Sequence, residues 1–548
     1  MKKINTDLKY LIWLWIILIL AIIPTYAHHG NLLIDCGREA YYPTQVLLGK
    51  VLYKDIFNIY GPFAYMLNAL LFKVFSVNLN VLYLAGCTSA FLIVSLTYLI
   101  SKQFLSRFLS LTIGVFTISI GVLNTNLFNF IFPYSYGMLY GITAFLASVL
   151  LILKYQKSPE KVFYLYLGSF FAGLCITSKY EFLPYLLVII YSIIKIKSLN
   201  LKEYYYSFLS LLFVPIFCFG ILFLQGLSIN DLTSTFLTIK KMAQSETLKY
   251  FYQTQGVYFH KKLTGILFLN FVKTVLPLCL LVYGFKISRK MTSVITILIA
   301  SIFILLSITP ASFVFLPILI AIIAVLGFKK IIKNVPLTIL TLASITLSLK
   351  IFWGLTTLNY GVFFASFLFI TILSLILELF KDKTINQKAI GVYILIVSTV
   401  LCYQNLFALS IKNQPISTNQ GQIYTEQYLS VSTNDLINYI NKNTKKSDTI
   451  AIFPEGTLIN FLTQRPADNE YSSLIPLYVE TLGDEKIIDH FKKTKPQYII
   501  FNNWNTKDYY FNYICNDYAV SFCNYVARNY TQEKVIDNGL RYLIFKKR

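Results

Sequence analysis

Charged side chains are scarce in this sequence. Asp, Glu, Lys and Arg make up 13% of its 548 residues, hydrophobic residues make up 56%, and the mean hydropathy is +0.61. A soluble domain carries roughly a quarter charged residues, so this deficit excludes an ordinary soluble protein. Apolar runs of about 20 residues recur along the chain, and a helix of that length crosses a bilayer. The sequence therefore predicts a multi-pass α-helical membrane protein.

Acidic residues are the scarcer of the two charged classes. The chain has 25 Asp and Glu against 48 Lys and Arg, which gives a formal net charge of +23. In a soluble protein this excess would suggest a nucleic-acid partner. Here the basic residues stand mostly in short segments between apolar runs, which is the signal that sets membrane topology. We therefore expect the lipid bilayer as a partner and no nucleic acid.

Metal-binding patterns are also missing. There is no CxxC motif and no His/Cys spacing typical of zinc, and the adjacent His28 and His29 have no third ligand nearby. No cofactor is expected, and nothing in the sequence supports a divalent metal. If one helix carries Cys515 and Cys523, they are too far apart to pair. The cysteines in apolar runs are expected to be packing residues: Cys87, Cys175, Cys218, Cys279 and Cys402.

Length and apolarity predict about thirteen transmembrane helices. Residues 1–27 have the layout of a signal peptide, and we expect an uncleaved anchor because the chain is polytopic. The predicted spans are 11–27, 81–101, 108–124, 135–154, 162–178, 182–197, 205–225, 264–285, 291–309, 311–328, 335–353, 358–380 and 389–411.

The run 61–76 is apolar enough to span as well, and the charges decide its place. If it does not cross, every basic short loop falls on one side of the membrane, as the positive-inside rule requires. If it crosses, all later basic loops move to the outside. We therefore predict a juxtamembrane helix at 61–76, lying in the outer interface. The N-terminus is then cytoplasmic. The protein itself is expected in the inner or plasma membrane of the cell.

On this topology the outer side holds a long first loop, 28–80, a second loop, 226–263, and everything after about residue 412. The composition changes near Ser417, and predicted helices alternate with short predicted strands from there on, which indicates a small α/β domain. We expect a transmembrane domain over 1–411 and an extracytoplasmic domain over 412–548. The expected helices of this tail are 432–443, 483–493 and 516–529, and its expected strands are 449–454, 497–501, 534–536 and 540–545.

Two stretches carry a family resemblance. The first loop holds Asp35-x-x-Arg38, the pair Tyr41-Tyr42 and then GKVLYKDIFNIYGPF, and the tail holds IFPEGTLINFLTQRPA at 452–467. Both stretches resemble segments of the GT-C membrane glycosyltransferases, in the family 39/83-like group that includes protein O-mannosyltransferases and lipid A aminoarabinose transferases. The resemblance implies a GT-C type fold and transfer of a sugar from a polyprenyl-phosphate-linked donor.

Such a transfer needs a base for the acceptor hydroxyl and a cation for the departing phosphate. Asp35 directly follows the apolar run Leu32-Leu33-Ile34 and is the candidate catalytic base. Arg38 lies on the same face if this segment is helical, where it would bind phosphate or orient Asp35. The resemblance makes Lys179, in TSKYEF, a second donor-phosphate contact. The alternative for Lys179 is a lysine that extends from a helix end to the interface.

Weaker site candidates are Glu39, Asp55, Tyr60 and His260. An alternative role of Asp55 is to fix the loop. Tyr60 stands where aminoarabinose transferases have a Lys, and the turn 124–135 lacks an acid that relatives often carry there, so that specific activity is not expected. The loop 226–263 has two possible roles. It forms a lid over the donor, or its charged residues simply lie at the membrane interface beside a span. Glu455 and Arg465 are expected to cap the tail domain.

The function that the sequence favours is therefore a hexosyl or pentosyl transferase. It would act on the outer face of the membrane, on a hydroxyl of an envelope glycan, a lipid or a protein. A transporter or flippase for a lipid-linked sugar is a first alternative, but such proteins place ionisable residues in the middle of their spans. An envelope polymer ligase is a second alternative, but ligases tend to place their working residues in one long late outer loop.

Overall fold

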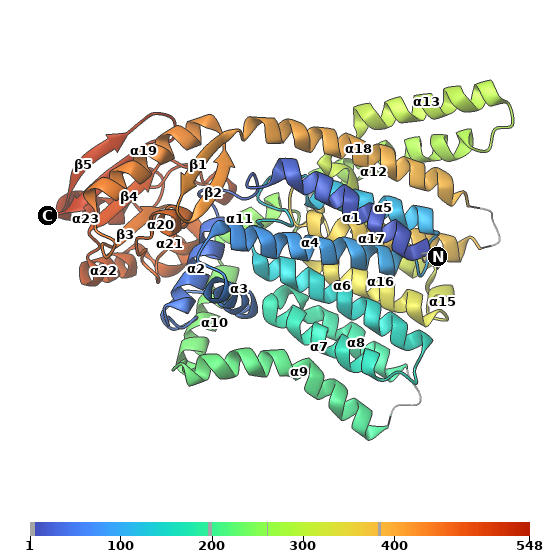
Figure 1. Ribbon diagram of the computed structural model, residues 1–548, viewed down its shortest axis with the longest axis horizontal. Coiled ribbons are helices and arrows are strands. Elements are labelled where there is room, and N and C mark those ends of the chain that lie inside the picture. Colours follow the sequence, from blue (N-terminus) through green and yellow to red (C-terminus); the bar gives the residue numbers. More distant parts are fainter. Residues whose placement is uncertain (1–5, 196–199, 260, 382–384) are drawn as a thin grey trace.

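The computed structural model describes residues 6–195, 200–259, 261–381 and 385–548. A bundle of helices, with the N-terminus at its far end, adjoins a smaller part that contains the sheet and the C-terminus (Figure 1). The bundle helices are α1 (Thr6–Thr25), α4 (Leu79–Ser101), α5 (Arg107–Gly121), α6 (Tyr136–Lys157), α7 (Phe163–Ser178), α8 (Leu186–Ile194), α9 (Leu201–Leu224), α12 (Lys261–Gly284), α13 (Lys290–Ser307), α14 (Leu316–Leu326), α16 (Val335–Ser348), α17 (Gly361–Leu379) and α18 (Gln387–Ile411).

Eight of the described helices are long and apolar enough to cross a membrane. The other five bundle helices are shorter, and they are continued in part by 3₁₀ turns such as η1 (Tyr180–Tyr185) before α8 and η3 (Leu349–Ile351) after α16. The helical membrane architecture is therefore confirmed. The count of thirteen spans stays a prediction.

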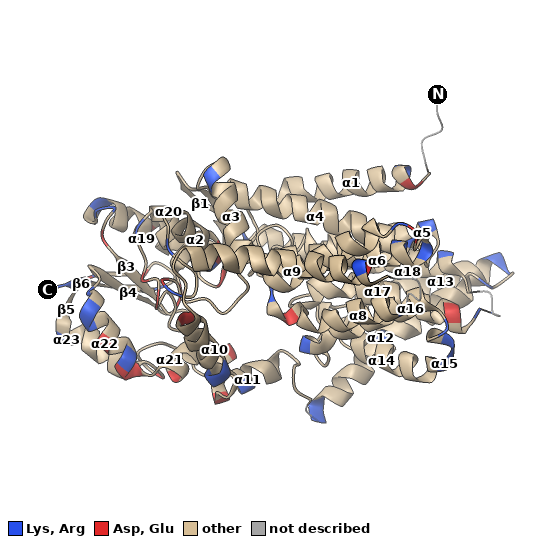
Figure 2. Ribbon diagram, turned by 90° about the horizontal axis from the view of Figure 1, so that it is seen from below, with Lys and Arg blue, Asp and Glu red and all other residues tan. Residues whose placement is uncertain are grey.

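Several basic connections meet at the end of the bundle that holds the N-terminus. Lys102 and Arg107, in the α4–α5 connection, each lie 2.8 Å from a carboxylate oxygen of Asp7. Lys330 donates to the carbonyl oxygen of Leu379, at the end of α17, over 3.2 Å. Figure 2 shows Lys and Arg on several connections at this end of the bundle. Basic residues on short connections are what the positive-inside rule expects at a cytoplasmic face.

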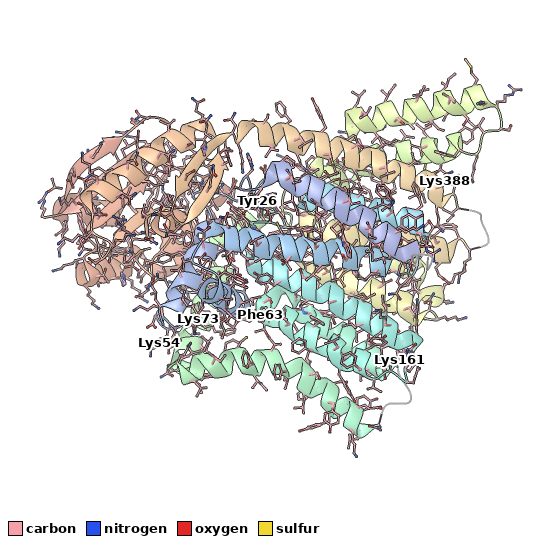
Figure 3. All side chains as sticks on the ribbon, in the orientation of Figure 1. Tyr26, Lys54, Phe63, Lys73, Lys161 and Lys388 are labelled. Carbon is pink, nitrogen blue, oxygen red and sulfur yellow. A yellow bond between two sulfur atoms is a disulfide. The ribbon has the colours of Figure 1, made fainter. Side chains whose placement is uncertain are left out.

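Labelled lysines mark the two ends of the bundle. Lys161 and Lys388 lie toward the end that holds the N-terminus, whereas Lys54 and Lys73 lie toward the sheet (Figure 3). Lysines therefore lie at both ends of the bundle, and the cytoplasmic N-terminus stays a prediction.

The first loop begins and ends on the same side of the bundle. The hydroxyl of Tyr26, just after α1, donates to the side chain of Asn80, in the first turn of α4, over 2.8 Å. Between them lie α2 (Cys36–Leu47) and α3 (Phe63–Val74), each of 12 residues. A helix of that length is about 18 Å long, short of the roughly 30 Å hydrocarbon core. This geometry supports the prediction that 61–76 does not cross the membrane.

The tail contains two sheets. β1 (Gln414–Thr418) and β2 (Gly421–Thr425) form an antiparallel hairpin, which the sequence did not predict. The larger sheet has the strand order β3-β4-β6-β5, with β3 and β4 parallel and the other pairs antiparallel. Its strands are β3 (Ile450–Phe453), β4 (Tyr498–Asn502), β5 (Tyr530–Ile536) and β6 (Tyr542–Lys547), and the tail helices are α19 (Gln427–Asn443), α20 (Thr457–Thr463), α21 (Pro476–Leu482), α22 (Asp484–Thr494) and α23 (Val520–Asn529).

The alternating helices and strands of the tail agree with the predicted α/β character, although α19 begins five residues before the expected Ser432. The division of the chain into two domains at 411/412 stays a prediction. Cys515 and Cys523 form a disulfide with their Cα atoms 5.5 Å apart, so the condition under which no pairing was expected is not met. The expectation assumed one helix over both residues, whereas α23 begins only at Val520 and Cys515 precedes it with a φ of 71°.

The tail is packed directly onto α2. A Cβ atom on Gly37 would lie 2.3 Å from the backbone nitrogen of Leu458, in α20, so the two helices meet here at backbone distance. The hydroxyl of Tyr41 accepts the backbone N–H of Ala467 over 2.7 Å, and the hydroxyls of Tyr42 and Ser472 lie 2.8 Å apart. Because these contacts join residues from opposite ends of the chain, α2 fixes the tail relative to the bundle.

A substitution of Gly37 tests this close packing. Gly37→Ala is expected to lower the stability of the protein by about 1–3 kcal/mol, because the added methyl must displace the α20 backbone. The measurement is the thermal unfolding midpoint of the purified protein in detergent. Gly220→Ala is the matched control, since nothing lies within 4 Å of that Cβ position and α9 is helical there. An unchanged midpoint for Gly37→Ala would contradict the packing described.

An ion-paired histidine supports the same interface. Nε2 of His490 lies 2.6 Å from a carboxylate oxygen of Asp468, and Nδ1 lies 3.1 Å from Glu470. The neighbouring carbonyl oxygen of Asn469 accepts the backbone N–H of Phe57, in the first loop, over 3.2 Å. Burial alone would lower the pKa of His490, but the hydrogen bonds with the two carboxylates outweigh burial and raise it to about 9. His490 therefore helps hold a segment that touches the first loop.

The raised pKa gives a signed pH dependence. Because the folded protein binds the His490 proton more tightly than the unfolded chain, the stabilisation is complete below an unfolded pKa of about 6.5 and is lost as the pH rises through about 9. His490→Gln is expected to flatten the dependence of the unfolding midpoint on pH over this range, whereas Lys493→Gln, exposed on the same helix, should not. The same slope in wild type and His490→Gln would be evidence against this role.

Candidate active site

A cavity of about 490 Å³ lies between the tail and the adjoining end of the bundle. The first loop, the starts of several bundle helices and the tail all contribute to its wall. Three of the residues that the sequence singled out, Asp35, Arg38 and Lys179, line this one cavity together with Tyr60. The structure thus brings the predicted base and both predicted phosphate contacts into a single site.

Arg38 is the best-connected residue of the site. Nη1 donates to Oδ1 of Asp35 over 2.8 Å, Nε donates to Oε1 of Glu39 over 3.1 Å, and Nη2 donates to the carbonyl oxygen of Tyr134 over 2.9 Å. The guanidinium carbon also lies 4.7 Å from the ring centre of Tyr60. A guanidinium fixed at this many points is well placed to orient Asp35, as the sequence suggested.

Asp35 stands at the N-cap of α2 in a strained conformation. Its φ is 54° and its ψ is −50°, a region that side chains other than Gly rarely adopt. The side chain of Asn31 accepts the backbone N–H groups of Leu33 and Ile34, each over 2.9 Å, and so forms the tight turn that leads into Asp35. Strain of this kind concentrates at functional sites, where the surrounding structure holds it in place.

Glu39 faces away from the cavity and holds three elements together. Its carboxylate accepts the backbone N–H of Tyr136, at the start of α6, over 2.7 Å, and the hydroxyl of Tyr65, in α3, over 3.1 Å. It also receives the Nε bond from Arg38. The side chain is buried and is absent from the cavity wall, so its contacts indicate a structural role rather than the site role that the sequence left open.

Lys179 lies among aromatic rings, directly after α7. Its amino group donates to the hydroxyl of Tyr134 and lies 4.5 Å, 5.0 Å and 5.7 Å from the ring centres of Tyr134, Tyr60 and Tyr360. The side chain is buried, so it does not extend to a lipid interface as the alternative for Lys179 required. Burial lowers the pKa of Lys179 to about 7, and the Glu181 carboxylate acts against this shift, so an anionic ligand in the cavity would favour the charged form of the lysine.

A second lysine of the site was missed by the sequence analysis. Lys350, in η3, pairs with the carboxylate of Glu181 and lies 4.0 Å from the ring centre of Tyr360. The same Glu181 oxygen lies 3.6 Å from the amino group of Lys179, so one carboxylate serves two lysines. The available signal was a lysine near the end of the apolar run 335–353, because ionisable residues in membrane spans are costly and tend to be functional.

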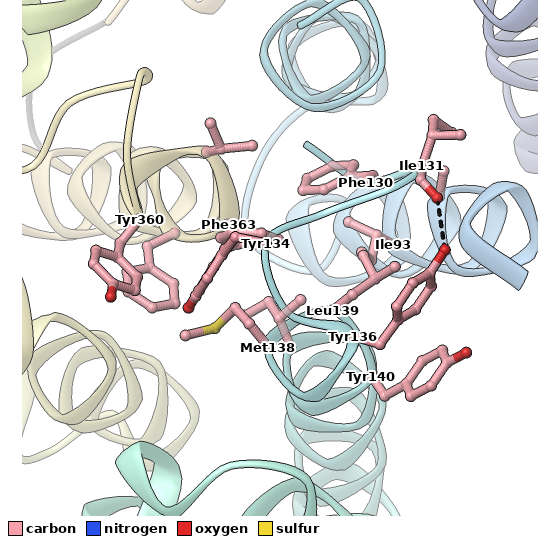
Figure 4. Packing of buried hydrophobic residues seen from close by; sticks show 14 of the residues in the cluster. Ile93, Phe130, Ile131, Tyr134, Tyr136, Met138, Leu139, Tyr140, Tyr360 and Phe363 are labelled. Atoms are coloured by element: carbon pink, nitrogen blue, oxygen red, sulfur yellow. Dashed lines mark hydrogen bonds between the residues drawn. The ribbon is translucent and has the colours of Figure 1, made fainter. Parts of the chain in front are cut away.

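Aromatic side chains form the wall behind the two lysines. The rings of Tyr134 and Tyr360 have their centres 5.5 Å apart, and Phe363 lies 6.2 Å from Tyr134. Figure 4 shows these three rings together beside Met138. Their apolar faces limit access of water to the cations, and an interaction of a cation with an anionic ligand is stronger where water is excluded.

The tail also contributes carboxyl groups to the cavity wall. Glu455, in the stretch 452–467, lines the wall close to Asp35. The sequence had instead suggested that it caps the tail domain. Burial raises the pKa of Glu455 to about 8, the nearby Asp35 charge acts in the same direction, and Arg38 acts against both. Arg465 does act within the tail, where it donates to the side chains of Thr444 and Asn441.

The remaining candidates lie elsewhere. The carboxylate of Asp55 accepts the backbone N–H of Val51 over 2.8 Å, in agreement with the alternative that it fixes the loop. His260 lies outside the described residues. His28 stacks on Tyr424, and His29 is buried with Nε2 2.7 Å from the carbonyl oxygen of Val122. In the described part of the chain, no three His, Cys, Asp or Glu residues form a group that could hold a metal ion.

The loop 226–263 covers the cavity with two helices, α10 (Ile229–Ala243) and α11 (Glu246–Thr254). Met242 and Phe251 from these helices are part of the wall. Glu480, in α21, accepts the first two backbone N–H groups of α11 over 3.1 Å and 3.2 Å. Because the segment is tied to the tail and faces the cavity, the structure favours a cover over the site rather than charges that merely flank a span.

The comparisons with known proteins found no matching family model and no matching curated protein. Among solved structures, ArnT from Cupriavidus metallidurans bound to undecaprenyl phosphate is 9% identical, with a TM-score of 0.52 and 98% of each chain covered. The apo oligosaccharyltransferase of Archaeoglobus fulgidus is 11% identical, with a TM-score of 0.52 over 92% of this chain and 70% of that chain. At these identities the similarity shows the fold alone. The chain therefore has the fold of the GT-C membrane glycosyltransferases.

Proposed function

We propose that the protein is a GT-C glycosyltransferase that moves a sugar from a polyprenyl-phosphate-linked donor to a hydroxyl acceptor. The observation that carries the proposal is the single cavity in which Asp35 meets Arg38, Lys179 and Lys350. The structure of ArnT with undecaprenyl phosphate supports a lipid-linked donor. The direct test is transfer by the purified protein, assayed with a panel of polyprenyl-phosphate hexoses and pentoses and an envelope extract as acceptor.

The three cations act on the donor phosphate. When the bond between the sugar and the phosphate oxygen breaks, its electron pair stays on that oxygen, and the polyprenyl phosphate leaves with added negative charge. Lys179, Lys350 and Arg38 face the cavity from three separate segments, so they can surround this charge as it develops. In a partly buried site each such contact lowers the energy of the leaving phosphate by more than it would in water.

Asp35 acts on the acceptor. Its carboxylate takes the proton of the acceptor hydroxyl while the acceptor oxygen bonds to the anomeric carbon of the sugar, on the side opposite the leaving phosphate. The result is transfer with inversion. The ion pair with Arg38 fixes the direction in which the carboxylate points, and Arg38 in turn is anchored on the backbone of Tyr134.

The proposed site faces the outer side of the cell membrane, with the tail extracytoplasmic. The basic connections at the opposite end of the bundle support this orientation. The acceptor would be an envelope glycan, a lipid or a protein. A flippase for a lipid-linked sugar is the alternative, but its working residues are expected at mid-span, whereas these charges lie at the end of the bundle, beside the tail.

Replacement of the base gives the first functional prediction. Asp35→Asn keeps the size of the side chain and removes the proton acceptor, so transfer should fall by about 100-fold or more. The measurement is turnover of labelled polyprenyl-phosphate sugar by the purified variant. Asp55→Asn is the control, because that carboxylate lies outside the cavity wall and should support near-normal turnover. Turnover of Asp35→Asn within threefold of wild type would rule out the assignment.

The second prediction concerns Lys350. Lys350→Gln removes one charge-assisted contact to the donor phosphate, so the KM for the donor should rise by about 10- to 100-fold, with a smaller change for the acceptor. Lys73→Gln, an exposed lysine at the end of α3, is the control for a change in overall charge. An unchanged donor KM in Lys350→Gln would leave Lys179 and Arg38 as the phosphate contacts.

A further inference from the structure

The cavity wall changes character from the bundle to the tail. The cations that line it, Arg38, Lys179 and Lys350, precede the tail in the chain. Among the tail residues that line the cavity, the charged side chains are all carboxyl groups, from Glu455, Glu470 and Asp508. If the phosphate of the donor occupies the cationic side, the tail side is left for the acceptor.

Glu455 is the most enclosed of these carboxyl groups. Its backbone carbonyl oxygen accepts the side-chain N–H of Asn502 over 2.8 Å, which fixes the residue at the end of the sheet. The titratable and charged groups that face it are Asp35, Arg38, Tyr478, Tyr509 and Tyr518. Because burial raises the pKa of Glu455 to about 8, its protonated form, with one O–H donor and one carbonyl acceptor, is accessible near neutral pH.

Aromatic rings complete the tail side. Tyr478 packs edge-on against Phe57, with ring centres 5.7 Å apart, and Tyr509 stacks on Phe251 at 4.9 Å. Trp504 lines the same side. Large rings with a few hydrogen-bonding groups between them suit a ligand that has both apolar C–H faces and hydroxyls, which is the chemistry of a sugar ring.

We propose that the acceptor is a neutral or cationic sugar, bound on the tail side of the cavity with one hydroxyl hydrogen-bonded to Glu455. This inference rests on the proposed function and adds the class of acceptor. A sugar that carries a phosphate or a carboxylate is disfavoured, because the tail residues of the wall include no Lys or Arg to pair with it and the carboxylate of Asp508 would repel it, whereas Glu470 is already paired with His490. Glu455 thus acts as a binding residue, and the proton transfer stays with Asp35.

Binding of simple sugars to the full-length protein tests the inference without any transfer assay. The probes are methyl glucoside, glucosamine and glucuronate, titrated by calorimetry into the purified protein in detergent. The first two should bind at pH 7, and glucuronate should bind at least about tenfold more weakly. Glu455→Ala should weaken methyl glucoside binding by about 3- to 10-fold, the effect of one hydrogen bond. Glu485→Gln, exposed on α22, is the matched control.

The pH dependence separates a direct role of Glu455 from a structural one. In the wild type, methyl glucoside binding should change as the pH rises through about 8, because the carboxyl group of Glu455 turns from a donor and acceptor into an acceptor only. Glu455→Gln does not titrate and should bind equally well at pH 7 and pH 9. The same change in Glu455→Gln, or no effect of Glu455→Ala, would overturn the role of Glu455.

Failure of the two proposals gives different results. Equal or tighter binding of glucuronate, or no binding of any of the three sugars, would overturn the inferred acceptor class. Binding of the neutral and cationic sugars together with no transfer from any polyprenyl-phosphate sugar would contradict the glycosyltransferase and retain the sugar-binding site.

Discussion

The guanidinium of Arg38 is the point on which the site depends. It donates to Asp35, to Glu39 and to the backbone of Tyr134, so a single side chain joins the first loop to the start of α6. Little of Arg38 is exposed, and Glu39 is almost wholly buried. Buried charges are tolerated only when they are paired and hydrogen-bonded, and loss of one partner leaves the other unpaired at a cost of several kcal/mol. The arrangement therefore fixes Asp35 in one orientation.

The first loop has a second task, which is to carry the tail. Tyr41 and Tyr42, one turn along α2 from Arg38, hold the segment that follows α20. The bond between Tyr41 and Ala467 spans 426 residues of sequence. As a result, α2 presents Asp35 and Arg38 to the cavity at its first turn and fixes the opposite wall through its next turns. One short helix therefore contributes to both walls.

The sequence predicted those parts of this arrangement that depend on local pattern. Asp35 and Arg38 are three residues apart, and the helical spacing brings both to the cavity. The contact between Tyr26 and Asn80 agrees with the return of the first loop to the side from which it starts, which the charge distribution suggested and which stays a prediction. The parts that were not predicted depend on long-range packing. Lys350 reaches the site only because α16 ends beside Glu181, a contact between residues 169 positions apart.

The position of Glu455 was predicted wrongly for a related reason. In the sequence it stands beside Gly456 at the start of a short helix, a setting in which a carboxylate usually serves the helix end. Its charged neighbours Asp35 and Arg38 come from the start of α2, and no local pattern predicts them. The disulfide between Cys515 and Cys523 was not predicted for a similar reason. Its prediction requires the start of α23 to within a few residues, and helix boundaries are the least certain feature of a sequence-based prediction.

The division of charge in the cavity follows from this construction. A lipid-linked donor must reach its site from the bilayer, so its phosphate is expected to meet groups held by the bundle, where Lys179, Lys350 and Arg38 lie. An acceptor that arrives from the aqueous side meets the tail first. On the bundle side the cations Arg38, Lys179 and Lys350 outnumber the carboxylates Asp35 and Glu181, whereas the charged groups on the tail side are all carboxyl groups. Each side is thus able to select its own ligand, with Asp35 at the boundary where an acceptor hydroxyl and a donor sugar would meet.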